Sequence, residues 1–217
     1  SSDRFFIGSS GECRFKDSLV IDNSTSGMCF GTSGGTTTLD SVATLSMVSG
    51  FTGNITFKGF HKLGTGTQSF SFPSSSSKLI LGPNNVWNGN FNFLGQYVQL
   101  NGNIFHGRTE ITRYGTSNEI SNGGNTFNDD VVLRDSVSAH SHNWYHSYVT
   151  SDTYNADATF VQKGTSVFIY PAYAANAIFK ANVLVDGSSA IQFGASTGKV
   201  IFSGDSLQEF TKVGSYT

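Results

Sequence analysis

A seven-residue motif that recurs along the chain constrains the fold more than any other feature. Each copy opens on an aromatic residue, has mostly small and polar residues at its third and fourth positions, and is mostly apolar at its fifth and seventh. Alternate residues share one face of a strand, so the motif predicts an aromatic corner, a turn that Asn, Asp or Gly can make with a left-handed backbone, and an inward-facing strand. The copies are FKDSLVI (15–21), FTGNITF (51–57), WNGNFNF (87–93), FHGRTEI (105–111), FNDDVVL (127–133), YNADATF (154–160) and FKANVLV (179–185).

The spacing of the aromatic positions predicts a solenoid. Successive copies begin 36, 36, 18, 22, 27 and 25 residues apart. Spacings of 18 to 27 fit one coil of a parallel β-helix, and 36 is interpreted as two coils with one motif lost. Further strands are expected at 78–82, 97–100, 166–170 and 190–193. We therefore expect an all-β, right-handed parallel β-helix (β-solenoid) of roughly seven to nine coils, with the handedness taken from the bias of parallel crossovers.

Composition supports this fold class and excludes several functions. Strong helix formers are scarce, and 37% hydrophobic residues suffice for a buried core. A net charge of −2 with 13% charged residues offers no basic face for nucleic acid. No apolar run approaches the roughly 20 residues of a membrane span.

A longer repeat lies over the short one. Residues 15–31 resemble 179–194, and residues 53–67 resemble 204–217. Neither end reads as the polar cap that a solenoid needs. We expect residues 1–217 to be a single β-solenoid segment of a longer array, in which 15–67 resembles 179–217.

Three pieces of the chain resemble a known repeat family. They are LGPNNVWNGNFNF (81–93), VQLNGNIFHGRTEI (98–111) and GGNTFNDDVVL (123–133). From about residue 10 onward the chain is similar to the NTFNG-type repeat region of very large secreted or cell-surface proteins of the Bacteroidetes, which the type IX system exports. The sequence departs from that pattern at Asp129–Asp130, where Asn-Gly is usual, and in the stretch 139–148.

The resemblance implies an extracellular, cell-surface location and a structural role. We expect a stiff stalk, fibre or filament used for attachment to other cells, without enzymatic activity or cofactor. Partners would be further copies of the chain, assembled laterally or end to end, and glycans or proteins on other cells. Two alternatives stay open: a carbohydrate-binding β-helix module, and a polysaccharide lyase-like β-helix enzyme.

An aromatic cluster outside the repeat is the candidate contact site. Aromatic rings can stack on sugar rings or on a partner chain. The cluster comprises Trp144, Tyr145, Tyr148, Tyr170 and Tyr173, with ordinary packing of an irregular coil as the competing interpretation.

The same stretch holds three histidines, His140, His142 and His146, near Asp135 and Asp152. Imidazoles two apart on a strand share a face, so His140 and His142 could hold a metal ion together with a carboxylate. The favoured interpretation is a solvated segment whose polar side chains point outward, and no metal is expected.

The acidic residues Asp129, Asp130 and Asp135 are too few for a calcium site, which requires six to eight oxygen ligands. A lyase would also need a base, and the candidates Arg113 and Arg134 fit surface positions. The four Glu residues show no pairing of the kind a glycosidase requires. The sequence therefore favours a chain with no catalytic residues.

Two cysteines, Cys13 and Cys29, lie sixteen residues apart. The favoured interpretation is a pair of semi-buried thiols. The alternative is a disulfide between adjacent strands, which an extracellular location would permit.

Overall fold

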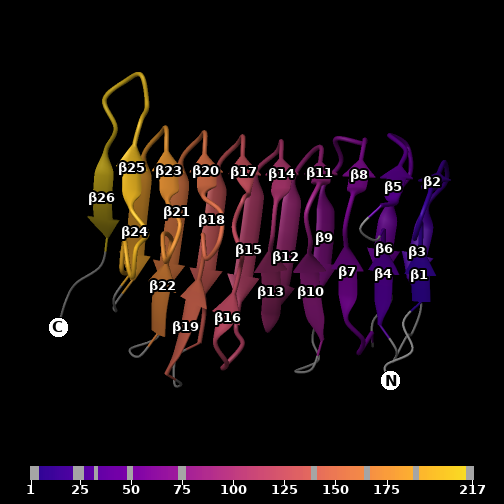
Figure 1. The fold of residues 1–217 in the computed structure, drawn as a ribbon, viewed down its shortest axis with the longest axis horizontal. Coiled ribbons are helices and arrows are strands. Elements are labelled where there is room, and N and C mark those ends of the chain that lie inside the picture. The colour runs from indigo at the N-terminus through magenta and orange to yellow at the C-terminus, as the bar shows by residue number, and fades with distance from the viewer. Residues whose placement is uncertain are drawn as a thin grey trace.

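The structure, a computed structural model, describes residues 5–21, 27–31, 34–47, 51–72, 77–137, 141–163, 167–187 and 191–213. Every regular element in these ranges is a β-strand, all strand pairs are parallel, and most strands pair with the equivalent strand of the next coil. The strands stack into a β-solenoid with three faces (Figure 1). The expected all-β solenoid is confirmed.

The three faces are defined by the strands that each coil contributes in turn. Face 1 consists of β1 (Phe5–Ile7), β4 (Met28–Phe30), β7 (Ile55–Phe57), β10 (Lys78–Leu81), β13 (Tyr97–Leu100), β16 (Glu119–Ile120), β19 (His142–Tyr145) and β22 (Val167–Tyr170). Face 2 consists of β2 (Glu12–Phe15), β5 (Thr36–Leu39), β8 (Phe60–Lys62), β11 (Asn85–Trp87), β14 (Asn103–Phe105), β17 (Thr126–Phe127), β20 (Asp152–Tyr154), β23 (Ala177–Phe179) and β25 (Val200–Phe202). Face 3 consists of β3 (Leu19–Ile21), β6 (Leu45–Met47), β9 (Gln68–Ser71), β12 (Phe91–Gly95), β15 (Thr109–Arg113), β18 (Val131–Asp135), β21 (Ala158–Gln162), β24 (Val183–Gly187) and β26 (Phe210–Val213).

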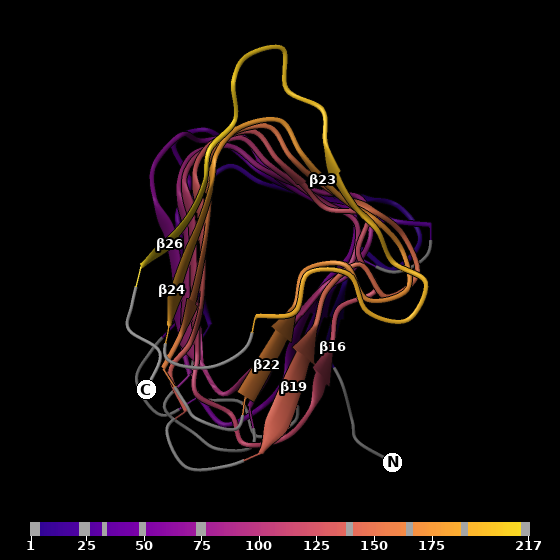
Figure 2. The same ribbon diagram turned by 90° about the vertical axis from the view of Figure 1, so that its left-hand side faces the viewer.

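These strands make eight three-strand coils, followed by β25 and β26. Figure 2 views the stack with the C-terminal end nearest, and the chain runs anticlockwise from β22 through β23 to β24 while it advances toward the viewer. An anticlockwise advance toward the viewer is a right-handed coil, as expected. Face 2 forms one nine-stranded sheet, whereas face 1 is divided between β13 and β16 and face 3 between β6 and β9.

Three of the additional strands lie where the sequence places them. They are β10, β13 and the described part of 166–170, which is β22. At 190–193 the described residues form no strand, although Ile191 makes a single parallel bridge to Ile169 on face 1. The ninth coil therefore begins on the same face as the others.

The aromatic corner lies at the end of most face 2 strands. Trp87, Phe105, Phe127, Tyr154, Phe179 and Phe202 occupy equivalent positions in register. Ring centroids are 5.2 Å apart for Phe105–Phe127, 5.1 Å for Phe127–Tyr154 and 4.6 Å for Tyr154–Phe179, all stacked. The rings from Phe105 to Phe179 therefore form a continuous column in the core, as the motif predicts.

One copy of the motif was assigned to the wrong corner. Phe51 precedes β7 on face 1, so FTGNITF is not a face 2 corner followed by a face 3 strand. The equivalent positions between Phe15 and Trp87 are Leu39 and Lys62. The two 36-residue spacings therefore contain three coils of 24, 23 and 25 residues, which an aromatic-only pattern could not reveal.

The left-handed backbone expected in the motif is found mainly at another corner. Between face 1 and face 2, Gly59, Asn84, Gly102 and Gly124 occupy stacked positions with φ of 59°, 65°, 74° and 79°. Asn tolerates this conformation better than other residues with a side chain. The motif's polar fourth residue instead joins neighbouring coils: the Arg108 backbone N–H, for example, donates to Oδ1 of Asn90 (3.1 Å).

The longer repeat remains a prediction. Residues 15–31 and 179–194 both begin at the end of a face 2 strand. In the second match, however, β8 lies on face 2 and β26 on face 3.

Candidate functional site

Four tyrosines form a patch on the outside of face 1, which we call the tyrosine patch: Tyr145, Tyr148, Tyr170 and Tyr173. Tyr145 stacks on Tyr170 (5.1 Å between centroids) and Tyr148 on Tyr173 (5.2 Å), while Tyr145 meets Tyr173 edge-on at 4.5 Å. Tyr148 is 37% exposed and the other three are partly buried. Strands β19 and β22 place Tyr145 and Tyr170 in register, which explains why residues from two coils meet. The expected cluster of tyrosines is therefore present.

The side chain of Trp144 does not belong to this patch. Because neighbouring residues of a strand point to opposite faces, Trp144 lies inside the coil and is fully buried. It packs against the imidazole of His146, with ring centroids 4.5 Å apart. The expectation that Trp144 offers an exposed ring for a ligand is wrong.

The histidines are also buried, which contradicts the expected solvated segment. His142 is 2% exposed, and its Nε2 lies 2.9 Å from Oδ2 of Asp135. His146 is fully buried, neither ring nitrogen has a hydrogen-bond partner, and burial lowers its pKa to about 3. His140 lies outside the described residues. Among the described residues, no group of His, Cys, Asp or Glu has the arrangement of a metal site.

The acidic residues are dispersed. Asp129 and Asp130 lie exposed at the outer corner after β17, whereas Asp135 is fully buried at the end of β18. Asp135 Oδ2 pairs with Nη1 of Arg113 at 3.1 Å, and both side chains are inaccessible to solvent. Arg113 was expected on the surface, and that expectation is wrong. These residues do not form a common cation or lyase site.

Arg113 is held entirely by groups inside the coil. Its Nε donates to the backbone oxygen of Gln96 (3.3 Å), its Nη2 donates to that of Ser117, and its guanidinium lies over the ring of Trp144. Burial lowers the pKa of Arg113, although arginine stays charged in proteins. Such a charge is tolerated inside a protein when a counter-ion and hydrogen bonds replace its hydration. The cluster of Arg113, Asp135 and His142 is therefore a structural ion network.

A ladder of amide side chains runs inside face 2 and was missed in the sequence. Nδ2 of Asn85 donates to Oδ1 of Asn103 (2.9 Å), Nδ2 of Asn103 to Oδ1 of Asn125 (2.9 Å), and Nδ2 of Asn125 to Oδ1 of Asp152 (2.8 Å). All four residues are buried. A sequence signal exists: each stands two residues before the aromatic corner, in NVW, NIF, NTF and DTY.

Asp152 ends this ladder. Its Oδ2 accepts hydrogen bonds from the backbone N–H of Ser147 (3.2 Å) and from the Ser147 hydroxyl (3.0 Å). Burial nevertheless raises the pKa of Asp152 to about 6, because desolvation outweighs these donors. The ladder therefore closes on a carboxyl group that titrates well above the usual range of aspartate.

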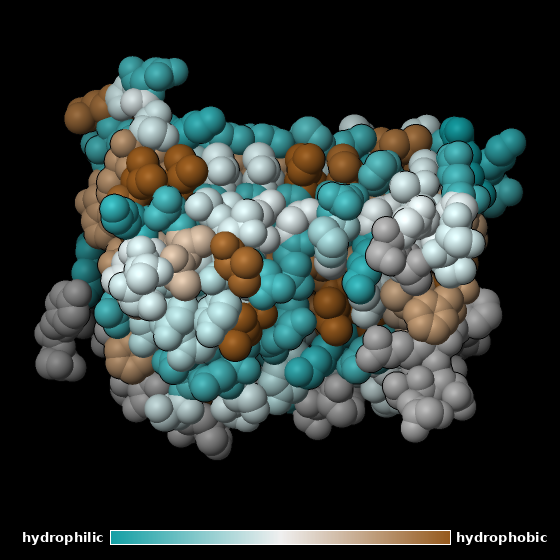
Figure 3. Space-filling model, in the orientation of Figure 1, coloured by the Kyte–Doolittle hydropathy of each residue, from teal (hydrophilic) through white to brown (hydrophobic). Residues whose placement is uncertain are grey.

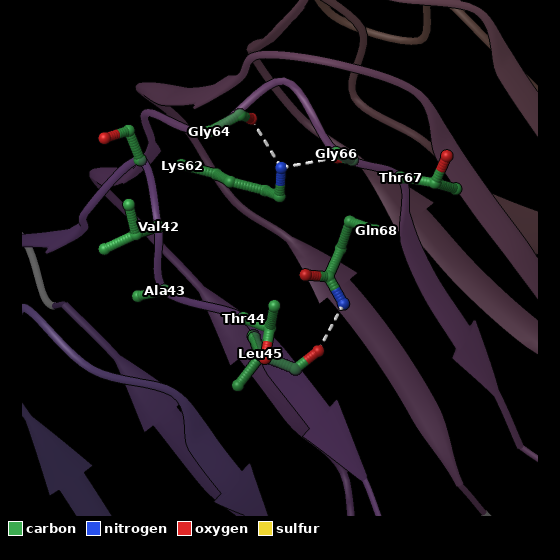
Figure 4. A pocket seen from close by; sticks show the side chains of 10 residues that line it. Val42, Ala43, Thr44, Leu45, Lys62, Gly64, Gly66, Thr67 and Gln68 are labelled. Atoms are coloured by element: carbon green, nitrogen blue, oxygen red, sulfur yellow. Dashed lines mark hydrogen bonds between the residues drawn. The ribbon is translucent and has the colours of Figure 1, made fainter.

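Lys62 occupies the position that an aromatic ring holds in later coils. Its Nζ donates to the backbone oxygens of Gly64 (2.5 Å) and Gly66 (2.6 Å) (Figure 4). It also donates to the backbone oxygen of Asn88 (3.2 Å). The side chain lines a cavity of about 90 Å³ between the second and third coils, next to Gln68, which donates to the backbone oxygen of Leu45 (2.9 Å). Burial lowers the pKa of Lys62, but all three N–H donors have acceptors. We interpret Lys62 as an internal brace for the turn that follows it.

Cys13 and Cys29 are both thiols and lie on different faces, in β2 and β4. Cys13 is partly buried, and the buried Cys29 Sγ donates to the backbone oxygen of Gly31 (3.1 Å). The structure thus has two thiols and not the disulfide of the alternative.

No protein-family model, no curated protein and no solved structure matches this chain. Among the described residues there is no helix with the length and apolar character needed to cross a bilayer. The tyrosine patch is the group of predicted residues that the structure brings together at the surface.

Proposed function

We propose that the chain is a structural segment of a very large extracellular surface protein. In this role it forms part of a stiff stalk, fibre or filament that attaches a cell to other cells. The observation that carries the proposal is the unbroken nine-stranded sheet of face 2, which runs the length of the stack.

Three sets of interactions run parallel to the long axis. They are the backbone ladders of parallel strands, the column of stacked rings and the buried amide ladder. Bending the stack would stretch all three on one side of the coil. The interior is thus suited to a stiff rod. The buried ion network and the amide ladder bind neighbouring coils to each other.

A second candidate function, carbohydrate binding, is favoured by the tyrosine patch. Figure 3 shows that the face carrying β16, β19 and β22 is mostly hydrophilic or intermediate, with strongly hydrophobic residues scattered over it. Partly exposed tyrosines on such a surface could stack on sugar rings and donate hydrogen bonds. We propose no lyase activity, because the acidic residues considered for it lie apart.

Glycan-array binding would test this second function. Tyr148→Ala and Tyr173→Ala should each abolish binding, whereas Tyr97→Ala, on the same face but outside the patch, should not. Absence of binding to every glycan would refute it.

Electron microscopy of the intact parent protein tests the structural proposal. Rods or filaments on the cell surface are the expected result. A short parent protein that forms compact particles would overturn it.

A further inference from the structure

The outside of face 2 carries an unusual row of side chains. One outward position of each strand from β11 to β25 lies in register with the next. All six of these residues are β-branched and uncharged, and all are at least partly exposed. This β-branched row consists of Val86, Ile104, Thr126, Thr153, Ile178 and Ile201.

We propose that the β-branched row is the surface on which a second copy of this chain docks, with the two solenoids side by side and antiparallel. The inference rests on the proposed function and names the partner and the face through which such rods associate.

The order of residues in the row is self-complementary. Read in either direction, two threonines stand at its centre with two aliphatic residues on each side. A two-fold axis between the third and fourth positions would place Thr126 opposite Thr153 of the second copy and Ile104 opposite Ile178 of the second copy. An isologous contact of this kind pairs like with like in every coil.

The spacing also matches, because both copies repeat at the strand separation of about 4.8 Å. β-branched side chains have few rotamers, so ordering them in a contact costs little entropy. A charged or irregular partner would find neither matching charges nor matching spacing on this row.

The borders of the row are polar groups that are already paired. Nδ2 of Asn155 donates to Oδ1 of Asn128 (2.7 Å), and Nδ2 of Asn128 lies 3.2 Å from Nδ1 of His106. Two exposed lysines flank the C-terminal end of the row, Lys180 and Lys199. An antiparallel arrangement puts the lysines of the two copies at opposite ends, where they do not repel each other.

The contact area indicates a weak dimer. Six coils at about 4.8 Å and a width of about five residues give roughly 500 Å² per copy. Standard stable interfaces bury about 800 Å² per partner. Association should therefore depend strongly on concentration, which suits rods that are held together at many points.

Sedimentation velocity over a dilution series tests the inference. The wild-type chain should show a reversible monomer–dimer equilibrium, and Ile104→Lys and Ile178→Glu alone should each weaken it by roughly tenfold or more. Together, the two substitutions should restore the dimer, because each new lysine would face a new glutamate twice across the axis. Leu94→Lys, an exposed position on face 3, is the matched control and should leave the dimer unchanged.

A wild-type chain that is monomeric at every concentration would overturn the inference, as would single variants that still dimerise or a double variant that stays monomeric. Circular dichroism shows whether each variant is folded. Monomers combined with a rod-shaped parent protein would remove this contact and leave the proposed function standing. Dimers combined with a compact parent protein would support this contact and overturn the proposed function.

Discussion

Face 2 and the corner between faces 3 and 1 are stabilised by different kinds of interaction. On face 2, nine strands stay in register, and from β11 to β17 the inward side chains repeat as amide then aromatic. At the corner where face 3 turns into face 1, which we call the irregular corner, each coil differs: it has Arg113 and Glu119 in one turn and Asp135 and His142 in the next. Face 1 pairing is interrupted at this point, between β13 and β16.

The two regions divide the repeated and the non-repeated interactions between them. Side chains that recur from coil to coil lie on face 2, whereas side chains that differ from coil to coil lie at the irregular corner. Identical groups on face 2 can pair with any neighbouring copy, so they hold coils together without selecting which coil comes next. The groups of the irregular corner pair with particular side chains: Arg113 and His142 with Asp135, and Glu119 with Gln99. We expect these pairs to fix the order of coils, a role of buried charges that is documented in some proteins.

The largest effect is expected from removing one member of the ion network. Asp135→Ala would leave Arg113 buried without its counter-ion, and loss of one partner of a buried pair costs about 3–5 kcal/mol. Urea unfolding measures the change, and Asp129→Ala, at an exposed corner, is the control that should change little. A loss below about 1 kcal/mol would mean that the buried pair adds little to stability and is not the structural ion network described above.

The contribution of Asp152, the last residue of the amide ladder, to the free energy of unfolding should depend on pH. The folded-state pKa of Asp152 is about 6, raised from 3.8, so its contribution to stability is complete at low pH and is lost as pH rises from about 4 to about 6. Asp152→Asn removes the charge and keeps one acceptor oxygen for Asn125, whereas its amide nitrogen cannot accept from the Ser147 N–H, a loss that is the same at every pH. Its stability relative to wild type should therefore rise across that window by up to about 3 kcal/mol.

Unfolding free energies measured from pH 4 to pH 7 would show this rise. Asp157→Asn, at an exposed outer corner, should show none. A constant difference between Asp152→Asn and wild type would indicate that Asp152 is ionised throughout.

A smaller effect is expected from interrupting the amide ladder. Asn103→Ala removes the acceptor of Asn85 and the donor to Asn125, and an unsatisfied buried amide costs about 1–3 kcal/mol. Thermal and urea unfolding should show a loss near 2 kcal/mol. Asn92→Ala, on the exposed side of face 3, should cost at most about 0.5 kcal/mol; equal losses would show that the ladder adds nothing.

The smallest effect is expected at the tyrosine patch. Tyr148→Ala removes a ring that is 37% exposed and stacks on Tyr173, so the loss of unfolding free energy should be about 1 kcal/mol. A large loss would identify the patch as part of the folding core and weaken its candidacy as a contact surface.

The contrast between face 2 and the irregular corner also explains which parts of the structure could be predicted from the sequence. The aromatic column and most coil boundaries follow from the repeat, because a repeated residue marks a repeated position. Leu39 and Lys62 escaped detection since they occupy the same corner without an aromatic ring. The amide ladder was visible in principle, as an Asn or Asp two residues before the corner, but polar residues there were not expected inside.

The irregular corner could not be predicted for a physical reason. Arg113 and Asp135 are residue types that are usually exposed, and their burial depends on each other and on His142, which come from different coils. The strand 142–145 alternates between inside and outside, so a one-residue change of register decides whether Trp144 or Tyr145 faces solvent. That register is set by pairing with β22, which the repeat does not encode.

Native-state hydrogen exchange tests most directly whether face 2 unites the coils. If it does, amides of β11, β14, β17 and β20 should share the slowest exchange and open together, while those of β13 and β16 exchange faster. Two independently opening blocks that divide on every face between the fifth and sixth coils would contradict the account, because face 2 would then not hold the stack together as one rod.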